Sequence, residues 1–178
     1  LKEKGDTVPD FFSMVLFDSD CLFTATATGQ NIGVRSKPAL CAARKQFVGA
    51  GPMVDYVSSS QSASGRSVLV LSRHLKASDG QFDGGVLGVI ELERTQRWFE
   101  SLDIDGNDSV SLLDRSQVLL ARKPFLQSSI EKRVLTSLSF KDLQEKNVAS
   151  GMARAFDIDG RERLFGYYII EDFPFTIV

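Results

Sequence analysis

Two stretches of the sequence share one pattern: residues 15–26 read VLFDSDCLFTAT and residues 111–122 read SLLDRSQVLLAR. Asp18 in the first stretch aligns with Asp114 in the second at a shift of 96 positions. An apolar run, a polar turn and a second apolar run are typical of a β-hairpin. Asp suits the first turn position because its carboxylate can accept hydrogen bonds from backbone N–H groups further along. Each stretch therefore predicts a hairpin.

A second match falls at almost the same shift. Gly65 and Gly160, each followed by Arg, align at a shift of 95. Either match alone is weak, but two at nearly one shift indicate two copies of a single unit. Two copies are too few for a solenoid.

The first copy continues with a helix and three strands. Ser36 is a candidate N-cap, Pro38 suits the first turn, and Leu40, Ala43 and Phe47 share one helical face. The β-branched or alternating segments that follow predict strands at residues 53–59, 66–75 and 85–93. Residues 94–102 then predict a short helix, with Thr95, Trp98, Phe99 and Leu102 on one stripe.

The second copy repeats the hairpin. Ser128 and Glu131 have capping-box spacing, which predicts a helix with Ile130, Val134 and Leu138 facing inward. Strands are expected at residues 152–157 and 163–170, and a last strand within 173–178. The predicted class is α+β, with two tandem modules, each a mostly antiparallel five-stranded sheet flanked by helices.

Composition excludes several classes of protein. The chain has 178 residues, with 21 basic and 23 acidic side chains and a net charge of −2. This charge does not indicate electrostatic binding to nucleic acid or to an anionic membrane surface. One histidine and two cysteines are too few for a zinc cluster. No apolar run is long enough to cross a bilayer. We expect neither a metal nor a cofactor.

The sequence contains no clear catalytic or metal-binding motif. His74 ends a predicted strand, and the chain has neither a nucleophile elbow nor a Walker loop. Residues 103–114 place Asp at the first, third and twelfth positions and Asn at the fifth, as calcium loops do with oxygen ligands. The sixth position is Asp108, however, where such loops need glycine for the turn. An acidic turn between helix and sheet is the preferred interpretation.

The two cysteines allow two interpretations. Cys21 and Cys41 could close a loop of about 20 residues in an oxidising compartment, which would stabilise the fold by about 3 kcal/mol. Alternatively, both are small buried apolar groups with free thiols. Sequence cannot place their Cβ atoms within bridging range, and we favour free thiols.

Candidate ligand-binding residues gather in the first copy. The predicted arrangement brings charged side chains toward the space between sheet and helix, with neutral donors beside them. The candidates are Arg44, Phe47, Tyr56, Ser58, Arg73 and Asp83. An inward guanidinium suits a small carboxylate or phosphate ligand. Surface charge, with an Arg73–Asp83 pair, is the open alternative.

Two runs carry a resemblance to a known family. Residues 64–86 (SGRSVLVLSRHLKASDGQFDGGV) and 99–124 (FESLDIDGNDSVSLLDRSQVLLARKP) resemble the motifs of double-Cache domains. These are tandem PAS-like extracytoplasmic sensors of bacterial transmembrane receptors, and the stretch from Gly65 to Pro124 is most similar to sensors attached to diguanylate cyclases. Cys21 departs from the family's turn glycine, and His74 stands where a second Arg is usual. The segment RKQF at 44–47 lacks the Trp and Tyr of amino-acid-binding relatives.

The resemblance implies an organisation and a role. Residues 1–93 would be the membrane-distal module, and residues 94–178 a linker helix plus the membrane-proximal module, truncated at its last strand. The chain would be the periplasmic part of an inner-membrane protein whose membrane spans lie outside this sequence. It would bind a small polar or anionic ligand and signal to a cytoplasmic diguanylate cyclase or kinase. No nucleic-acid partner is implied, and a homodimer of the whole receptor stays open.

Two alternatives remain at this point. A soluble periplasmic binding or adaptor protein would have no flanking membrane spans. An enzyme would have to use His74, Asp79 or Asp83, and substituting them would abolish turnover.

Overall fold

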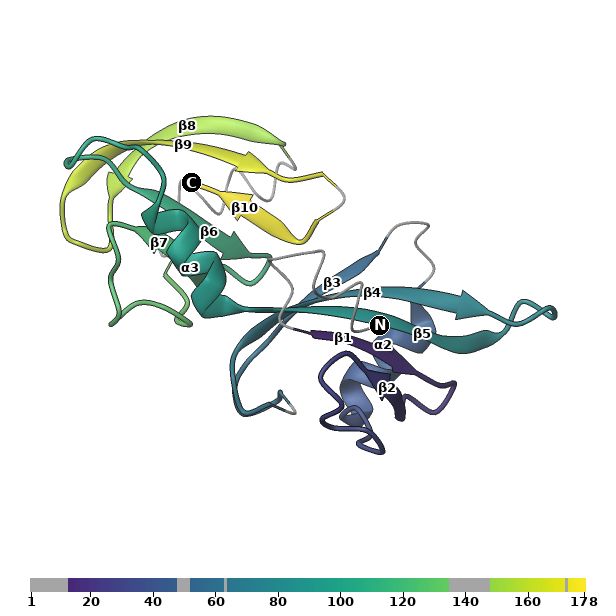
Figure 1. Ribbon diagram of the computed structural model, residues 1–178. Coiled ribbons are helices and arrows are strands. Elements are labelled where there is room, and N and C mark those ends of the chain that lie inside the picture. The colour runs from purple at the N-terminus through teal and green to yellow at the C-terminus, as the bar shows by residue number, and fades with distance from the viewer. Residues whose placement is uncertain (1–12, 48–51, 63, 135–147, 172) are drawn as a thin grey trace. The chain divides into compact units, whose positions relative to one another are not determined.

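Two compact units, Leu1–Arg94 and Thr95–Val178, make up the chain. The computed structural model describes residues 13–47, 52–62, 64–134, 148–171 and 173–178. Each unit contains one five-stranded antiparallel sheet (Figure 1). This confirms the predicted pair of five-stranded sheets and the α+β class.

The first unit has the strand order β2-β1-β5-β4-β3. Its elements are β1 (Ser13–Phe17), β2 (Phe23–Thr26), α2 (Pro38–Gln46), β3 (Met53–Val57), β4 (Val68–Lys76) and β5 (Phe82–Glu91). The second unit repeats that order as β7-β6-β10-β9-β8. Its strands are β6 (Val110–Asp114), β7 (Leu119–Lys123), β8 (Ser150–Phe156), β9 (Glu162–Ile169) and β10 (Phe175–Ile177). The helix α3 (Leu92–Glu100) contains the boundary between the units.

The two aspartates of the repeat occupy equivalent places. The Oδ1 atom of Asp18 accepts a hydrogen bond from the backbone N–H of Leu22 at 2.9 Å. The Oδ1 atom of Asp114 accepts one from the N–H of Val118 at 2.8 Å. Both hairpins therefore close on an aspartate, as the repeat predicted.

The core of the first unit lies between one face of its sheet and α2. Its buried side chains come from alternate positions of the strands and from the β1–β2 turn: Val15, Phe17, Cys21, Phe23, Val57, Val68, Val70 and Leu87. Leu40 and Cys41 of α2 pack against them. We call this side of the sheet the inner face. Alternation along each strand assigns every other residue to it.

The predicted details of α2 need correction. Its N-cap is Lys37, without a side-chain capping bond, and the hydroxyl of Ser36 instead accepts a hydrogen bond from Arg44 at 2.8 Å. The inward side chains are Leu40, Cys41 and Arg44, whereas Ala43 is exposed. A guanidinium can replace an apolar residue on the inward stripe because it finds polar partners there.

The helix α3 starts two residues earlier than predicted, at Leu92. Its buried side chains are Leu92, Gln96 and Phe99, and Trp98 is 61% exposed rather than inward. Gln96 exchanges two hydrogen bonds with the backbone of Arg122, at 2.8 and 3.0 Å. These bonds explain why a polar residue takes an inward position of the stripe.

The helix predicted at Ser128 does not form where the sequence placed it. Residues 127–131 are turns, and Glu131 has φ 63°, a left-handed conformation that a helix interior does not allow. The N–H of Glu131 donates to the carbonyl of Leu119 instead. Val134 follows an isolated bridge between Val118 and Arg133, and position 138 lies outside the described residues. Pairing with β7 therefore overrides the capping-box signal.

A buried ion cluster ties the second unit together. Asp157 pairs with Arg122 at 2.7 Å and with Arg163, and the side chains of Asp157 and Arg122 are 7% and 3% exposed. Arg163 also pairs with the more exposed Asp159 at 2.8 Å. Its hydrogen bond is the main reason that the pKa of Asp159 falls to about 2. The cluster joins β7 to the β8–β9 turn.

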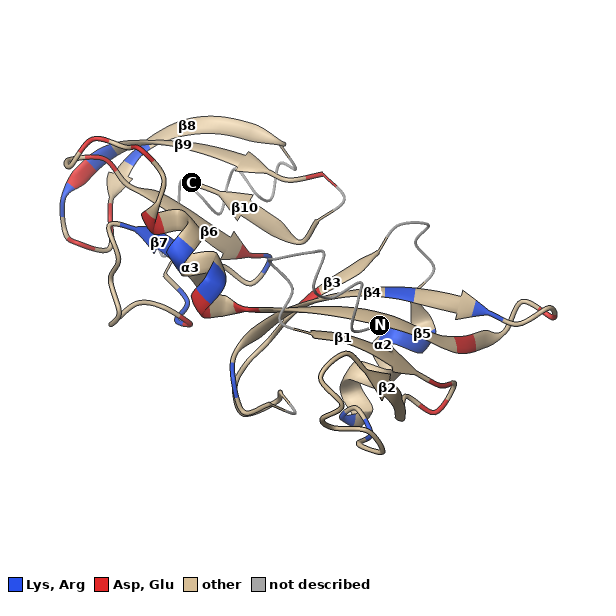
Figure 2. Cartoon of the chain, viewed as in Figure 1, with Lys and Arg blue, Asp and Glu red and all other residues tan. Residues whose placement is uncertain are grey.

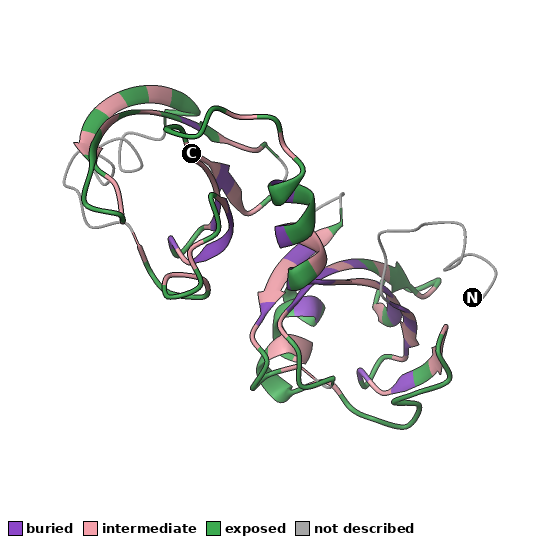
Figure 3. Cartoon of the chain, turned by 60° about the vertical axis from the view of Figure 1, so that its left-hand side comes forward, coloured by how far each residue is buried: buried purple, intermediate pink, exposed green. Residues whose placement is uncertain are grey.

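One face of the β8–β9 hairpin is exposed. Residues alternate between exposed and intermediate along β8 (Figure 3). Four large apolar side chains lie on the exposed positions: Met152, Phe156, Leu164 and Tyr168. Arg154 and Glu162 share this face.

Candidate ligand-binding site

A cavity of about 470 Å³ lies within the first unit. Its walls come from the inner face of the sheet, from α2, from the loop that precedes α2 and from the β3–β4 loop. A cavity of this size falls in the range of small-molecule sites.

The floor of the cavity is apolar and its rim is polar. Strand side chains supply the floor: Val15, Val57, Val68, Val70, Leu87 and Val89. Neutral polar side chains supply much of the rim: Thr28, Gln30, Asn31, Ser36, Gln61, Ser62 and Ser64. An apolar body with a few polar groups is what such a surface accommodates.

Arg44 is the most deeply buried cation of the wall, at 2% exposure. One Nη atom donates to Ser36, and the guanidinium lies 5.6 Å from the ring centroid of Phe17. Its Nε atom has no hydrogen-bond partner among the described residues. Burial lowers the pKa of Arg44, and the nearby Asp55 carboxylate counteracts that effect. A buried guanidinium with a spare donor is suited to an anionic group.

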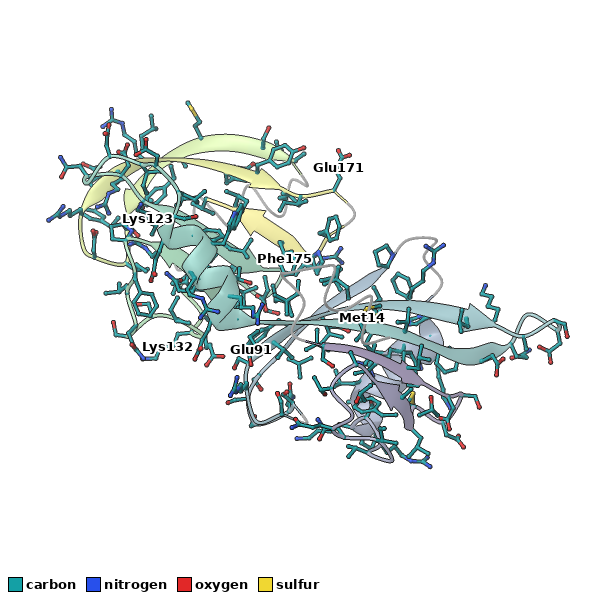
Figure 4. The ribbon with its side chains drawn as sticks, viewed as in Figure 1. Met14, Glu91, Lys123, Lys132, Glu171 and Phe175 are labelled. Carbon is teal, nitrogen blue, oxygen red and sulfur yellow. A yellow bond between two sulfur atoms is a disulfide. The ribbon has the colours of Figure 1, made fainter. Side chains whose placement is uncertain are left out.

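Two further cations lie at the rim, Lys37 just before α2 and Arg66 in the β3–β4 loop. The ammonium of Lys37 donates to the carbonyl of Ser60 at 2.6 Å. Arg66, from the β3–β4 loop, pairs with Glu91, the last residue of β5. Glu91 lies where β5 passes into α3 (Figure 4). Figure 2 colours the basic positions of α2 and of the β3–β4 loop blue.

Beneath the end of α2 lies a second polar group. His74 contacts the rings of Phe47 and Phe82 edge-on, with centroids 5.5 and 5.6 Å apart. Asp55 faces the same side of the sheet, since it pairs with Val70 in the ladder. Its Oδ2 atom has no hydrogen-bond partner among the described residues, and burial raises its pKa.

The pH dependence of stability reports on His74. Burial lowers its pKa below the usual 6.5, and Arg44 lowers it further. The unfolded chain then binds a proton before the folded chain does. This contribution to stability is complete above pH 6.5 and is lost as the pH falls toward the folded-state pKa. We expect the free energy of unfolding to fall between pH 7.5 and 5.5.

The control for this prediction is His74→Phe, which keeps a ring between the two phenylalanines. Its free energy of unfolding, measured by urea titration at both pH values, should change less with pH than that of the wild type. The raised pKa of Asp55 acts in the opposite direction near pH 4, and both proteins contain it. Equal pH slopes for the two proteins would contradict the assignment.

The structure brings one of the six predicted site residues to the cavity wall. Arg44 lines it, whereas Phe47 packs against His74 beside it. Arg73 and Asp83 are exposed. Tyr56 alternates with Val57, which faces inward, and so faces the other side of the sheet. Ser58 follows the end of β3 and does not line the cavity.

Arg73 lies on the outer face for the same reason. In β4 the inner face holds Val68 and Val70, and Arg73 is out of phase with them. Sequence reasoning could not assign the phase, because Leu69 and Val54 make the outer face of these strands apolar as well.

The cysteines form a disulfide, so the preference for free thiols was wrong. Cys21 and Cys41 are bridged, with Cα atoms 5.8 Å apart. Cys21 adopts φ 59°, the left-handed turn position where the resemblance led us to expect glycine. That conformation directs its side chain at α2. The bridge therefore anchors the helix that carries Arg44 to the β1–β2 hairpin.

The second unit offers a shallower surface. Its concavity is lined mostly by Ser150, Gly151, Met152, Gly166, Tyr167, Tyr168 and Ile177. Among the described residues, no lining group there is charged. Across all the residues that the structure describes, no group of three or more His, Cys, Asp or Glu side chains could hold a metal ion. Nor is any described helix long and apolar enough to span a membrane.

Comparison with solved structures defines the class of fold. The extracellular domain of rpHK1S-Z16, which is described as a histidine kinase, is 22% identical over 99% of this chain and 73% of its own, with a TM-score of 0.77. The sensor domain of the V. cholerae histidine kinase DctB is 11% identical over 99% of this chain and 74% of its own, with a TM-score of 0.61. No family model and no curated protein matches the sequence.

A chemoreceptor domain has the same fold. The ligand-binding domain of the Pseudomonas aeruginosa amino acid chemoreceptor PctB, in complex with L-Gln, is 16% identical. The match covers 95% of this chain and 67% of that one, with a TM-score of 0.62. The chain therefore has the fold of extracellular sensor and ligand-binding domains of histidine kinases and chemoreceptors. At these identities the likeness establishes the fold and leaves the ligand to be argued from the site.

Proposed function

We propose that this chain is the extracytoplasmic ligand-sensing domain of a transmembrane signal-transduction protein. One observation carries the proposal: a chain with a sensor-domain fold contains, in its first unit, a cavity with an apolar floor and the buried, partly unpartnered Arg44. Structural neighbours that bind small molecules, such as PctB with L-Gln, support the same role. The chemistry of the cavity is that of a binding site.

The proposal also covers the module organisation, the output domain and the residues of the site. The two units correspond to tandem PAS-like, double-Cache modules, with residues 1–93 distal and residues 94–178 proximal to an inner membrane. The output is a diguanylate cyclase or a kinase. The candidate residue retained from the sequence is Arg44, and the cavity adds Arg35, Lys37 and Arg66.

An ion pair supplies a route by which binding could be reported. Arg66 lines the cavity and pairs with Glu91, which directly precedes α3. A ligand anion that binds Arg66 competes with the Glu91 carboxylate for one guanidinium. Binding then changes the environment of the residue that begins the connection between the units. A ligand can shift a conformational equilibrium only through such a difference between two states.

The test is a thermal-shift screen of a mixed metabolite library on the purified chain. A ligand present at a hundredfold excess over its Kd stabilises the folded protein by about 2.7 kcal/mol, and so raises Tm. Arg66→Gln should weaken that response, and Arg73→Gln, on the outer face, should preserve it. An equal loss in both variants, or no response to any compound, would refute the proposed site.

The same samples distinguish a sensor from an enzyme. Mass spectrometry should recover the bound compound unchanged after prolonged incubation with the protein. Conversion that is lost in His74→Phe or Asp79→Asn would favour the enzyme alternative instead.

A further inference from the structure

The cavity of the first unit has a strongly one-sided charge. Four of its lining residues are cations: Arg35, Lys37, Arg44 and Arg66. Among the described residues that line it, none carries a carboxylate. The chain as a whole has a net charge of −2, so this gathering of positive charge is local to the cavity.

The contacts of these cations leave much of that charge uncompensated. Arg44 donates to a hydroxyl and Lys37 to a backbone carbonyl, both of which are neutral acceptors. The Asp55 carboxylate offsets part of the charge of Arg44 from outside the lining. Arg66 is the one whose ion pair, with Glu91, is observed within the described part of the chain. Like charges around one cavity repel each other, and an anion placed between them removes that repulsion. The site is therefore built for a ligand with more than one negative charge.

An α-amino acid fits this lining poorly. Its carboxylate would find donors, but its ammonium would find only the neutral oxygens of the rim, and no lining carboxylate, inside a wall that carries four positive charges. The carboxylate near Arg44 belongs to Asp55, which does not line the cavity and interacts with Arg44 instead. Burying an ammonium without a counter-charge is costly.

The apolar floor of the cavity indicates that the ligand also has a carbon skeleton. Its six aliphatic side chains, from Val15 to Val89, bind hydrocarbon and offer no polar group to a bare inorganic ion. Resting on the proposed function, we infer that the ligand is an organic anion with at least two negative charges, as carboxylate or phosphate, and with no ammonium group. Its carbon skeleton lies on the valine floor and its anionic groups lie against Arg44 and the rim cations.

The experiment is isothermal titration of the purified chain at constant ionic strength. The probes are glutarate and citrate for carboxylates, glycerol 3-phosphate for organic phosphates, inorganic phosphate for an anion without a skeleton, and L-glutamine and L-leucine for zwitterions. At least one of the three organic anions should bind, and should bind at least tenfold more tightly than inorganic phosphate and either amino acid. A comparison of glutarate and citrate with glycerol 3-phosphate shows whether the site prefers carboxylates or phosphates.

Substitutions at the rim test whether the anion binds in this cavity. Lys37→Gln and Arg35→Gln remove one exposed charge each and should weaken binding of that anion about tenfold. Lys45→Gln removes the same charge from the exposed side of α2, outside the cavity lining, and should leave the affinity unchanged. Equal effects of Lys37→Gln and Lys45→Gln would overturn the inference, since they would show only the general influence of charge.

The outcomes separate this inference from the function on which it rests. If L-glutamine or L-leucine binds most tightly and Lys37→Gln weakens it, the cavity is a sensor site but the inferred ligand class is wrong. If a probe binds and none of the lining substitutions alters its affinity, the proposed site itself fails. If none of the organic anions binds at millimolar concentration, the inferred ligand class is overturned.

Discussion

Replacing Asp157 with asparagine should lower the free energy of unfolding of the second unit by about 3–5 kcal/mol. The carboxylate of Asp157 is the acceptor for Arg122, which is almost completely buried, and for Arg163. It also accepts a hydrogen bond from the hydroxyl of Ser109 at 3.2 Å. Asparagine keeps the size of the side chain and removes its charge. The guanidinium of Arg122 would then stay buried without a counter-charge, which is the costly half of a broken ion pair.

Asp159→Asn is the matched control. Asp159 pairs with the same Arg163 but is more exposed, so solvent screens that pair and its substitution should destabilise the second unit far less than Asp157→Asn does. Trp98 is the only tryptophan, and it lies in the second unit, so its fluorescence in a urea titration reports on that unit. Losses within about 0.5 kcal/mol of each other would show that Asp157 does not compensate a buried charge.

Local signals in the sequence predicted the strands well. Each hairpin needs an aspartate at the start of its turn and apolar runs on both sides, and Asp18 and Asp114 make the expected hydrogen bonds to Leu22 and Val118. Such turns depend on residues within about five positions of one another. For that reason the repeat alone established two similar units.

Signals that compete with tertiary contacts were less reliable. The capping-box spacing of Ser128 and Glu131 favours a helix, but the backbone of Glu131 pairs with Leu119 of β7. The first copy shows the same pattern, in which Gly33 donates to Phe23 before α2 begins.

Most of the candidate site depended on strand phase, which the sequence left undetermined. A shift of one residue moves every side chain of a strand to the opposite face. Tyr56 and Arg73 were both chosen out of phase with Val57 and Val68. The rim cations Lys37 and Arg66 come from loops 29 positions apart, and no local pattern links them.

The second large effect should follow removal of the disulfide. Substituting Cys21 and Cys41 together by alanine opens a loop of 20 residues, and should lower the free energy of unfolding of the first unit by about 3 kcal/mol. The cost arises because the unfolded chain gains conformations that the bridge had excluded. Two alanines avoid placing a polar group in the core, where Cys21 is fully buried.

The bridge should also matter for binding, because it holds α2 and hence Arg44 against the cavity. Without it, part of the binding free energy is spent on fixing the helix, so the affinity for the ligand should fall along with stability. Urea titration of the double variant gives the first quantity, and isothermal titration with the tightest probe gives the second. Treating the wild type with dithiothreitol should reproduce both losses, and the double variant should then be insensitive to the reagent. A double variant that is within about 1 kcal/mol of the wild type would show that core packing, rather than the bridge, holds α2 in place.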